Sequence, residues 1–295
     1  MSAQFPIGES ELIINEKGCV YHLDLHPDEL ANLVITVGDP ARVPEVSKYF
    51  DKIEVQKAHR EFVSHTGYIG TKRLTVVSTG IGPDNIDIVL NELDALANID
   101  FGSRLPKQEL KSLEIVRMGT SGSLQEDIPV DDLVVSTFGI GLDNLLHFYH
   151  YEENAEIAYL RNAFEAHTAL TNASVRPYMV AGSIHLLNKF PVREGYHHGI
   201  TVTCPGFYAP QGRQLRLAPA FPNLIDALST FNSGNHRITN FEMETSAIYG
   251  LGKLLGHHCL SINTIVANRQ TKSFTKDAAQ AVDNMIKQSL ELLVQ

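Results

Sequence analysis

The sequence predicts an α/β fold with a mixed, mostly parallel central sheet flanked by helices on both faces. Short apolar runs rich in β-branched residues alternate with longer amphipathic stretches along the 295 residues. Strands that alternate with helices of roughly ten or more residues are typical of a sheet covered on both faces. No low-complexity linker, internal repeat or block of like charge divides the chain. We therefore expect a single domain over residues 1–295.

The expected strands are the apolar runs, most of which carry valine and isoleucine and stop near glycine, serine or asparagine. Such runs are typical of strands that are buried on both faces. In chain order they are Leu33–Val37, Leu74–Ser78, Leu113–Met118, Asp132–Thr137, Tyr178–Ile184 and Cys259–Ala267.

The expected helices are the longer stretches in which apolar residues recur with helical spacing. In chain order they are Asn85–Ala97, Ala155–Ala173, Phe221–Phe231, Glu242–Leu255 and Thr275–Leu293.

Two irregular segments remain. Asp100–Lys111 is polar, with a glycine and a proline, and looks like a surface excursion that could alter subunit packing. Pro191–Pro222 mixes glycine, proline and aromatic residues and is too long for a simple connection, so either a functional or a plain surface loop is possible.

Composition and charge exclude several classes of function. Hydrophobic residues make up 43% of the chain, enough for a substantial core. The net charge of −10 disfavours long nucleic acids and anionic membranes as partners, although a small anion could still bind in a local basic pocket. Cys19, Cys204 and Cys259 lie far apart, and no Cys/His set has zinc-site spacing, so we expect reduced thiols and no metal. With no visible signal peptide or membrane-length apolar run, the expected location is cytoplasmic.

A first candidate anion site follows the run Leu33–Val37. The chain turns at Gly38 and continues as Asp39-Pro40-Ala41-Arg42. Asp39 suits a helix N-cap and Pro40 the first helical position, so the free N–H groups and Arg42 could together hold a small oxyanion. A plain strand–helix turn with a surface arginine is the alternative.

A second candidate follows the same pattern at Arg117-Met118-Gly119-Thr120-Ser121-Gly122. Arg117 lies in an apolar run, where an arginine is costly unless it is paired or faces a ligand. A buried structural salt bridge would also explain it. The glycine turn Ser78–Gly82 lacks the spacing of a dinucleotide-binding fingerprint, so we reject that function.

With these two segments and six others, the chain resembles the nucleoside phosphorylase family, and within it most closely the members that cleave uridine. The matching segments occur in the family's order and cover nearly the whole chain. They are Val20-Tyr21-His22-Leu23, Gly38-Asp39-Pro40-Ala41-Arg42-Val43, His59-Arg60-Glu61-Phe62, Ser78-Thr79-Gly80-Ile81-Gly82, Arg117-Met118-Gly119-Thr120-Ser121-Gly122, Phe207-Tyr208-Ala209-Pro210-Gln211-Gly212-Arg213, Phe241-Glu242-Met243-Glu244 and Asn268-Arg269.

The resemblance implies a reversible reaction in which uridine and inorganic phosphate give uracil and ribose 1-phosphate. It implies a phosphate site, with Arg60 supplied by a neighbouring subunit, formed by Gly38, Arg42, Arg60, Arg117, Gly119 and Thr120. It implies base contacts from Phe207, Gln211 and Arg213, and ribose contacts from Met243, Glu244 and a neighbour's His22. Arg117, Gln211 and Arg213 are the expected catalytic residues. Sites shared in this way imply a homo-oligomer, a dimer or a hexamer.

These residue types suit the chemistry. The ribosyl group becomes positive and the departing base negative as the bond breaks, and arginines can hold an anionic nucleophile while Gln211 and Arg213 stabilise the base. Phosphate is a co-substrate, so no cofactor is expected. Some relatives bind a monovalent cation through the residue matching Glu61 and a serine where this chain has Asn85, which argues against that ion here.

Several alternatives remain open at the level of sequence. Gln211 and Arg213 could be solvated surface side chains and His22 a surface histidine, and Glu242 has capping-box spacing from Thr239 and could simply cap a helix. Asn268 stands where purine-cleaving relatives carry an aspartate, which disfavours purines. The rival functions are a purine or broad-specificity nucleoside phosphorylase and a non-catalytic nucleoside-binding protein.

Overall fold

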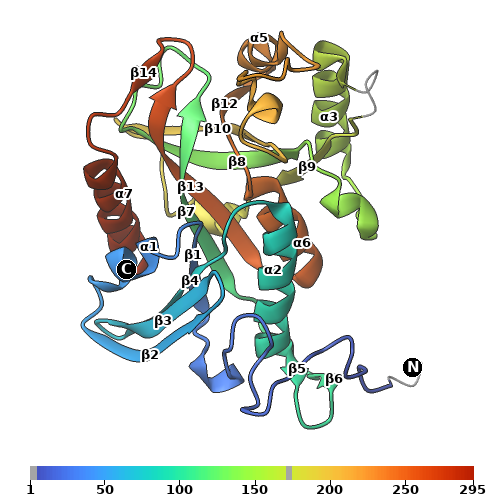
Figure 1. The fold of residues 1–295 in the computed structure, drawn as a ribbon, viewed down its shortest axis with the longest axis vertical. Coiled ribbons are helices and arrows are strands. Elements are labelled where there is room, and N and C mark those ends of the chain that lie inside the picture. Colours follow the sequence, from blue (N-terminus) through green and yellow to red (C-terminus); the bar gives the residue numbers. More distant parts are fainter. Residues whose placement is uncertain (1–4, 171–174) are drawn as a thin grey trace.

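A large twisted sheet runs through the protein, whose computed structural model describes residues 5–170 and 175–295 (Figure 1). Within these residues, twelve strands form this sheet, and most follow the order β11-β12-β10-β8-β13-β7-β1-β4-β3-β2. The strands are β1 (Leu33–Val37), β2 (Lys52–His59), β3 (Phe62–Ile69), β4 (Lys72–Ser78), β7 (Glu114–Ser123), β8 (Leu133–Gly141), β9 (Tyr178–Ala181), β10 (Tyr196–Thr203), β11 (Asn232–Ser233), β12 (His236–Glu242), β13 (His258–Asn268) and β14 (Ser273–Phe274).

The sheet is mixed, and its parallel pairs fall into two groups of strands, β12-β10-β8 and β13-β7-β1-β4. β1 pairs in parallel with β4 and β7, and β7 pairs in parallel with β13. Antiparallel pairs join β2 to β3, β3 to β4, β8 to β13 and β12 to β7. The predicted mixed, mostly parallel sheet is confirmed. The carboxyl ends of β1, β4, β7 and β13 therefore meet at one edge, where α/β folds usually bind ligands.

Helices cover both faces of the sheet, as predicted (Figure 1). α2 and α6 pack against each other on one face, whereas α1, α4 and α7 contribute to the core on the other. A third apolar cluster lies under α3 and α5. The helices are α1 (Arg42–Ser47), α2 (Pro83–Asn98), α3 (Ala155–Thr168), α4 (Ile184–Leu187), α5 (Leu224–Thr230), α6 (Thr245–Leu255) and α7 (Ala278–Leu293), with 3-10 turns η1 (Pro27–Glu29), η2 (Leu145–Phe148) and η4 (Ala209–Gln211).

Some predicted boundaries were wrong. The chain does not turn at the second candidate anion site, Arg117–Gly122, because β7 continues to Ser123 and there pairs with both β12 and β13. α1 begins at Arg42 and not at Pro40, since Asp39 closes a turn first by accepting the Ala41 N–H through Oδ1. α6 begins at Thr245 because Glu242 still pairs with β10 as the last residue of β12.

Other segments also differ from the prediction. The expected strand Tyr178–Ile184 ends at Ala181, and α4 follows. The stretch predicted as irregular between 191 and 222 contains β10, and only its second half is a long loop. α3 ends at Thr168, and the last residues of the helix predicted there, 171–173, lie outside the described residues.

The excursion between α2 and β7 is a small hairpin of β5 (Ile99–Asp100) and β6 (Leu105–Pro106). Its turn residue Arg104 donates hydrogen bonds to the backbone carbonyls of Ile7, Gly8 and Leu12. The hairpin therefore holds the N-terminal segment against the domain, beyond the far end of α2 (Figure 1). Across the described residues, no helix combines the length and apolar character needed to cross a bilayer.

Candidate active site

A cavity of about 760 Å³ opens at the edge where β1, β4, β7, β12 and β13 end. Most of the residues predicted for the phosphate, base and ribose sites line it together. They are Gly38, Arg42, Arg117, Thr120, Phe207, Gln211, Arg213, Met243 and Glu244. The structure thus gathers residues that are more than 200 positions apart in the sequence at one hollow.

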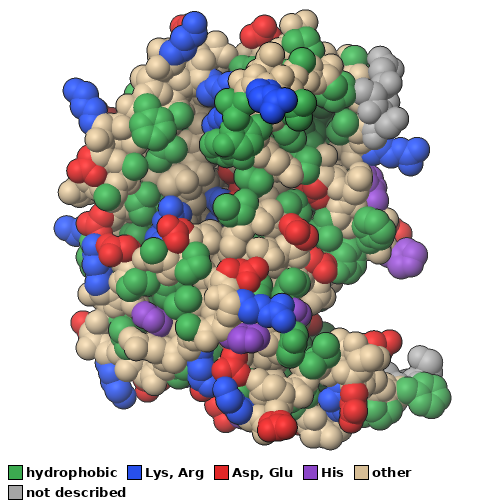
Figure 2. Space-filling view, in the orientation of Figure 1, with side chains coloured by type: hydrophobic (Ala, Val, Ile, Leu, Met, Phe, Trp, Pro, Cys, Tyr) green, Lys and Arg blue, Asp and Glu red, His purple; other side chains and the backbone are tan. Residues whose placement is uncertain are grey.

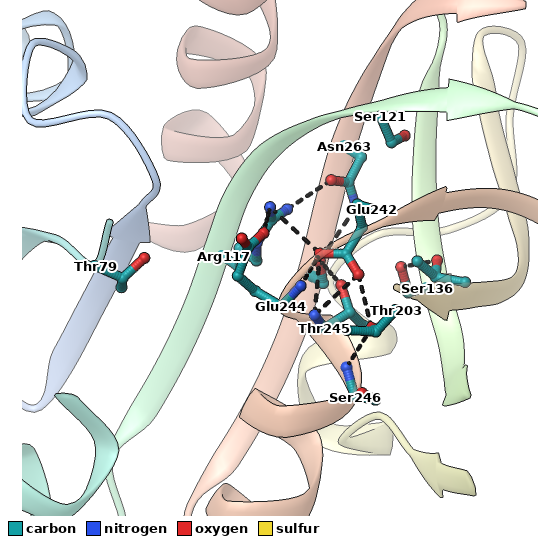
Figure 3. A network of polar contacts seen from close by, with 12 residues as sticks. Thr79, Arg117, Ser121, Ser136, Thr203, Glu242, Glu244, Thr245, Ser246 and Asn263 are labelled. Atoms are coloured by element: carbon teal, nitrogen blue, oxygen red, sulfur yellow. Dashed lines mark hydrogen bonds and ion pairs between the residues drawn. The ribbon is translucent and has the colours of Figure 1, made fainter. Parts of the chain in front are cut away.

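At the inner end of the cavity, β7 presents Arg117 among buried polar groups (Figure 3). Its Nη2 contacts a carboxylate oxygen of Glu244 and lies 3.3 Å from Oε2 of Glu242, and its Nη1 donates to Oδ1 of Asn263 at 2.6 Å. The two carboxylates raise the pKa of Arg117 although burial opposes the charge. Arg117 therefore forms the buried salt bridge considered as an alternative and also lines the cavity.

The two glutamates lie where β12 meets the N-terminus of α6. The carboxylate of Glu242 accepts the N–H groups of Glu244 and Thr245, and it accepts a hydrogen bond from Oγ1 of Thr203 at 2.8 Å. Glu242 thus binds the free amides of the helix, as its structural interpretation predicted. There is no capping box with Thr239, because the Thr239 hydroxyl donates to Ile200 and Asn240 instead.

Glu244 faces the cavity with one carboxylate oxygen on Arg117 and the other on the backbone N–H of Gly82 at 2.8 Å. Burial raises the pKa of Glu244, and the adjacent Arg117 acts in the opposite direction. A carboxylate held by two donors at the cavity wall can still accept the hydroxyls of a sugar.

Arg42 lines the same end of the cavity and differs from Arg117 in its partners. The only hydrogen bond of its guanidinium within the described residues is a long one of 3.4 Å from Nη1 to the carbonyl of Met118, and no carboxylate there pairs with it. Burial and the nearby Arg117 lower the pKa of Arg42, as expected for a cation next to another cation. A guanidinium so placed attracts a small anion, the ligand that would offset both effects.

The outer end of the cavity is formed by the loop around η4. Gln211 is buried, and its Oε1 accepts a hydrogen bond from Nη1 of Arg213 at 2.6 Å. Arg213 also donates to the carbonyl of Phe207 at 2.7 Å, and its guanidinium lies 3.8 Å from the centre of the Phe207 ring. Gly212 permits this arrangement, since it has a φ of 66° and an added Cβ would lie 2.6 Å from Ile225. Gln211 and Arg213 are therefore not merely solvated surface side chains.

Arg269 is a residue to which the sequence analysis gave no role. Its Nη1 donates to the carbonyl of Gln211 at 3.1 Å, and its charge contributes to lowering the pKa of Arg213. The only signal was its place in the last family segment, after Asn268. Phe241 and Ser121 also line the cavity without having been predicted to do so.

Asn268 does not line the cavity. It is buried, its Nδ2 donates to the carbonyls of Gln125 and Ile128, and its Oδ1 accepts the N–H groups of Gln270 and Thr271. Both polar atoms of the Asn268 side chain are thus used within the protein. Asn268 makes no contact at the cavity that would select against a purine base.

Three predicted site residues lie outside the cavity of their own chain. Gly119 lies beneath the guanidinium of Arg117, where an added Cβ would be 1.7 Å from Nη1. His22 places Nδ1 2.6 Å from Oε1 of Glu92, and Arg60 donates to the hydroxyl of Tyr21 at 3.2 Å. His22 and Arg60 are therefore neighbours through Tyr21, and neither lines the cavity of its own chain.

Glu61 and Asn85 both lie at the cavity wall beside Gly80. No group of three or more His, Cys, Asp or Glu side chains in residues 5–170 and 175–295 is arranged to hold a metal ion. The charged side chains that line the cavity are arginines and carboxylates.

Comparison with known proteins agrees with this architecture. The family model of the phosphorylase superfamily matches residues 32–294. A crystal structure of a Trypanosoma brucei nucleoside phosphorylase, described as showing uridine phosphorylase activity, superposes with a TM-score of 0.88 at 32% identity and covers 96% of this chain and 99% of its own. The uridine phosphorylase of Thermococcus kodakarensis is 28% identical over 95% of this chain and 88% of its own length, and that of Haemophilus influenzae is 29% identical over 88% and 90%. The chain belongs to the phosphorylase superfamily.

Proposed function

We propose that this protein is a pentosyltransferase that cleaves uridine with inorganic phosphate, giving uracil and ribose 1-phosphate, and that it also runs the reverse reaction. One observation carries the proposal: Arg42 has no carboxylate partner in residues 5–170 and 175–295, and it lies beside the paired Arg117 at one end of a cavity whose other end holds Gln211 and Arg213. The similarity to uridine phosphorylases over nearly the whole chain supports it.

Phosphate binds at the inner end in this proposal. Arg42 and Arg117 offer charged N–H groups, and Gly38 and Thr120 line the wall beside them. Glu244 and Met243 hold the ribose between the two ends. A phosphate oxygen then bonds to the anomeric carbon as the carbon–nitrogen bond breaks, and the bonding electrons leave with the base. The phosphate and Glu244 together stabilise the positive charge that develops on the sugar.

The base binds at the outer end. Since Oε1 of Gln211 is occupied by Arg213, the amide NH₂ group of Gln211 is left to donate to a carbonyl oxygen of the base. Arg213 supplies positive charge near the oxygen atoms that become negative as uracil departs. The exposed ring of Phe207 offers an apolar surface for the base. These donors suit a pyrimidine with two carbonyl groups.

The active form is a homo-oligomer in this proposal, with His22 and Arg60 completing the site of a neighbouring subunit. Their position beside Tyr21, outside their own cavity, supports this. No resident cofactor is required because phosphate is the nucleophile. Lys and Arg side chains are interspersed with Asp and Glu on the face in Figure 2, which does not favour nucleic acid as a partner. Three buried free cysteines fit a cytoplasmic enzyme.

The test is to incubate purified protein with uridine, thymidine or inosine, each with and without phosphate. We expect uracil release from uridine only when phosphate is present. Release without phosphate would contradict phosphorolysis, and a higher rate with inosine would identify a purine or broad-specificity enzyme. Uridine binding without turnover in phosphate buffer would identify a non-catalytic binding protein.

A further inference from the structure

The guanidinium of Arg117 has a neutral partner on the side away from its two glutamates. Asn263 lies on β13 directly opposite Gly119 of β7, is fully buried, and accepts from Nη1 of Arg117 at 2.6 Å (Figure 3). Arg117 is thus held on Nη2 by carboxylates and on Nη1 by an amide oxygen.

The orientation of the Asn263 amide is set by its other end. Nδ2 donates to Oγ of Ser261 at 3.1 Å, and the same Oγ accepts from Oγ1 of Thr245 at 2.8 Å. Ser261 and Asn263 are two residues apart on one strand, so both side chains lie on the same face of the sheet. Because Nδ2 is held by Ser261, Oδ1 is directed at Arg117.

Space for this pair is left by the glycine opposite it. A Cβ at Gly119 would lie 1.7 Å from Nη1 of Arg117 and 2.6 Å from Oδ1 of Asn263. Any side chain at position 119 would therefore displace the guanidinium or the amide. Gly119, which the resemblance places in the phosphate site, thus makes room for the groups that orient Arg117.

We infer that Asn263 is a positioning residue for phosphate: it orients the Arg117 guanidinium with a neutral acceptor. This inference rests on the proposed function, since it assumes that Arg117 binds phosphate. Two carboxylates already contact Arg117, and a third anion would oppose the binding of a phosphate anion. An amide holds the cation without that repulsion.

The test compares the steady-state constants for phosphate and for uridine in the wild type and in Asn263→Ala. We expect the KM for phosphate to rise by about tenfold, equivalent to about 1.4 kcal/mol, while the KM for uridine changes by less than about twofold. Asn263→Asp keeps the side-chain shape but adds the third negative charge, so its KM for phosphate should also rise selectively. If Asn263→Ala does not fold, Asn263→Asp decides the outcome.

Thr264→Val is the matched control, because Thr264 is the next residue of β13, is buried, and has a hydroxyl without a hydrogen-bond partner among the described residues. It should leave both KM values unchanged. An equal rise in both KM values, or a change in thermal stability alone, would overturn the role of Asn263. A wild type that needs no phosphate would instead overturn the proposed function, so the two failures are distinguishable.

Discussion

The two ends of the cavity are built differently, although arginine lines both of them. At the inner end, Arg117 is buried on a central strand and is held by Glu242, Glu244 and Asn263. At the outer end, Arg213 is partly exposed on a loop and is held by Gln211 and Phe207, which belong to the same loop. The side chains that hold Arg117 are buried in the core of the protein, whereas those that hold Arg213 belong to a loop at its surface.

Because of this difference, we expect mutations of the paired and the unpaired arginines to affect the stability of the fold differently. A buried ion pair that loses one partner leaves an uncompensated charge, which destabilises a protein by about 3–5 kcal/mol. A partly exposed loop arginine has no such carboxylate partner here within the described residues, so its loss should leave the fold nearly intact. Loss of the paired Arg117 should therefore reduce both stability and activity, whereas loss of an arginine without a carboxylate partner should reduce activity alone.

Arg117→Leu should have the largest effect. It leaves Glu242 and Glu244 buried without their cation, so we expect the free energy of unfolding to fall by about 3–5 kcal/mol. Loss of its charge from the phosphate site should lower kcat/KM by about a thousandfold. Urea unfolding and uracil release measure the two effects.

Arg42→Leu is the matched control, because Arg42 lies at the same end without a carboxylate partner among the described residues. We expect lost activity with a change in unfolding free energy below about 1 kcal/mol. Equal destabilisation by the two variants would contradict the distinction between the paired and the unpaired arginine.

Arg213→Ala should lower kcat by about a hundredfold, because the charge that develops on the base is no longer stabilised. The affinity for phosphate, measured by isothermal titration calorimetry, should remain within about twofold of wild type, since that site lies at the other end. A comparable loss of turnover and phosphate affinity would show that Arg213 has been assigned to the wrong end.

Arg60→Ala tests whether the cavity is completed by another subunit. Alone it should lower activity, as should Arg213→Ala, but unfolding and refolding the two variants together should restore activity. In a mixed dimer, one of the two sites carries both wild-type arginines, so about one site in four should be native after random assembly. If the mixture stays as inactive as its components, Arg60 does not serve a neighbour's site.

Phe207→Leu should have the smallest effect. The ring is about half exposed and stacks on Arg213, a contact worth about 0.5–1 kcal/mol at such sites. We expect the KM for uridine to rise by about twofold to fivefold, with the phosphate KM and the unfolding midpoint unchanged. A change in the phosphate KM would show that the two ends are coupled.

Much of the sheet could be predicted from sequence, because strands buried on both faces have continuous apolar runs. β1 was predicted at its observed bounds for this reason. β2 and β3 were missed because they carry charged and polar residues on partly exposed faces, so no apolar run marks them. β7 extends through two glycines because β12 and β13 supply hydrogen-bond partners that are remote in sequence.

The site was predictable as a set of residues but not as a geometry. Arg117 stood out because an arginine is rare in an apolar strand, yet its pairing with Glu244 joins positions that the sequence does not relate. Asn263 gave no signal, since a polar residue in a strand has many explanations. The structure was also needed to show that His22 and Arg60 do not line the cavity of their own chain.

The most direct test of the account is a crystal structure with phosphate and uracil bound. We expect the phosphate between Arg42 and Arg117, and the uracil against Phe207 within hydrogen-bond distance of Gln211 and Arg213. The outer end offers a rival cation, Arg213, with Arg269 close behind it. Phosphate bound there, with the inner end empty, would contradict the assignment of the two ends.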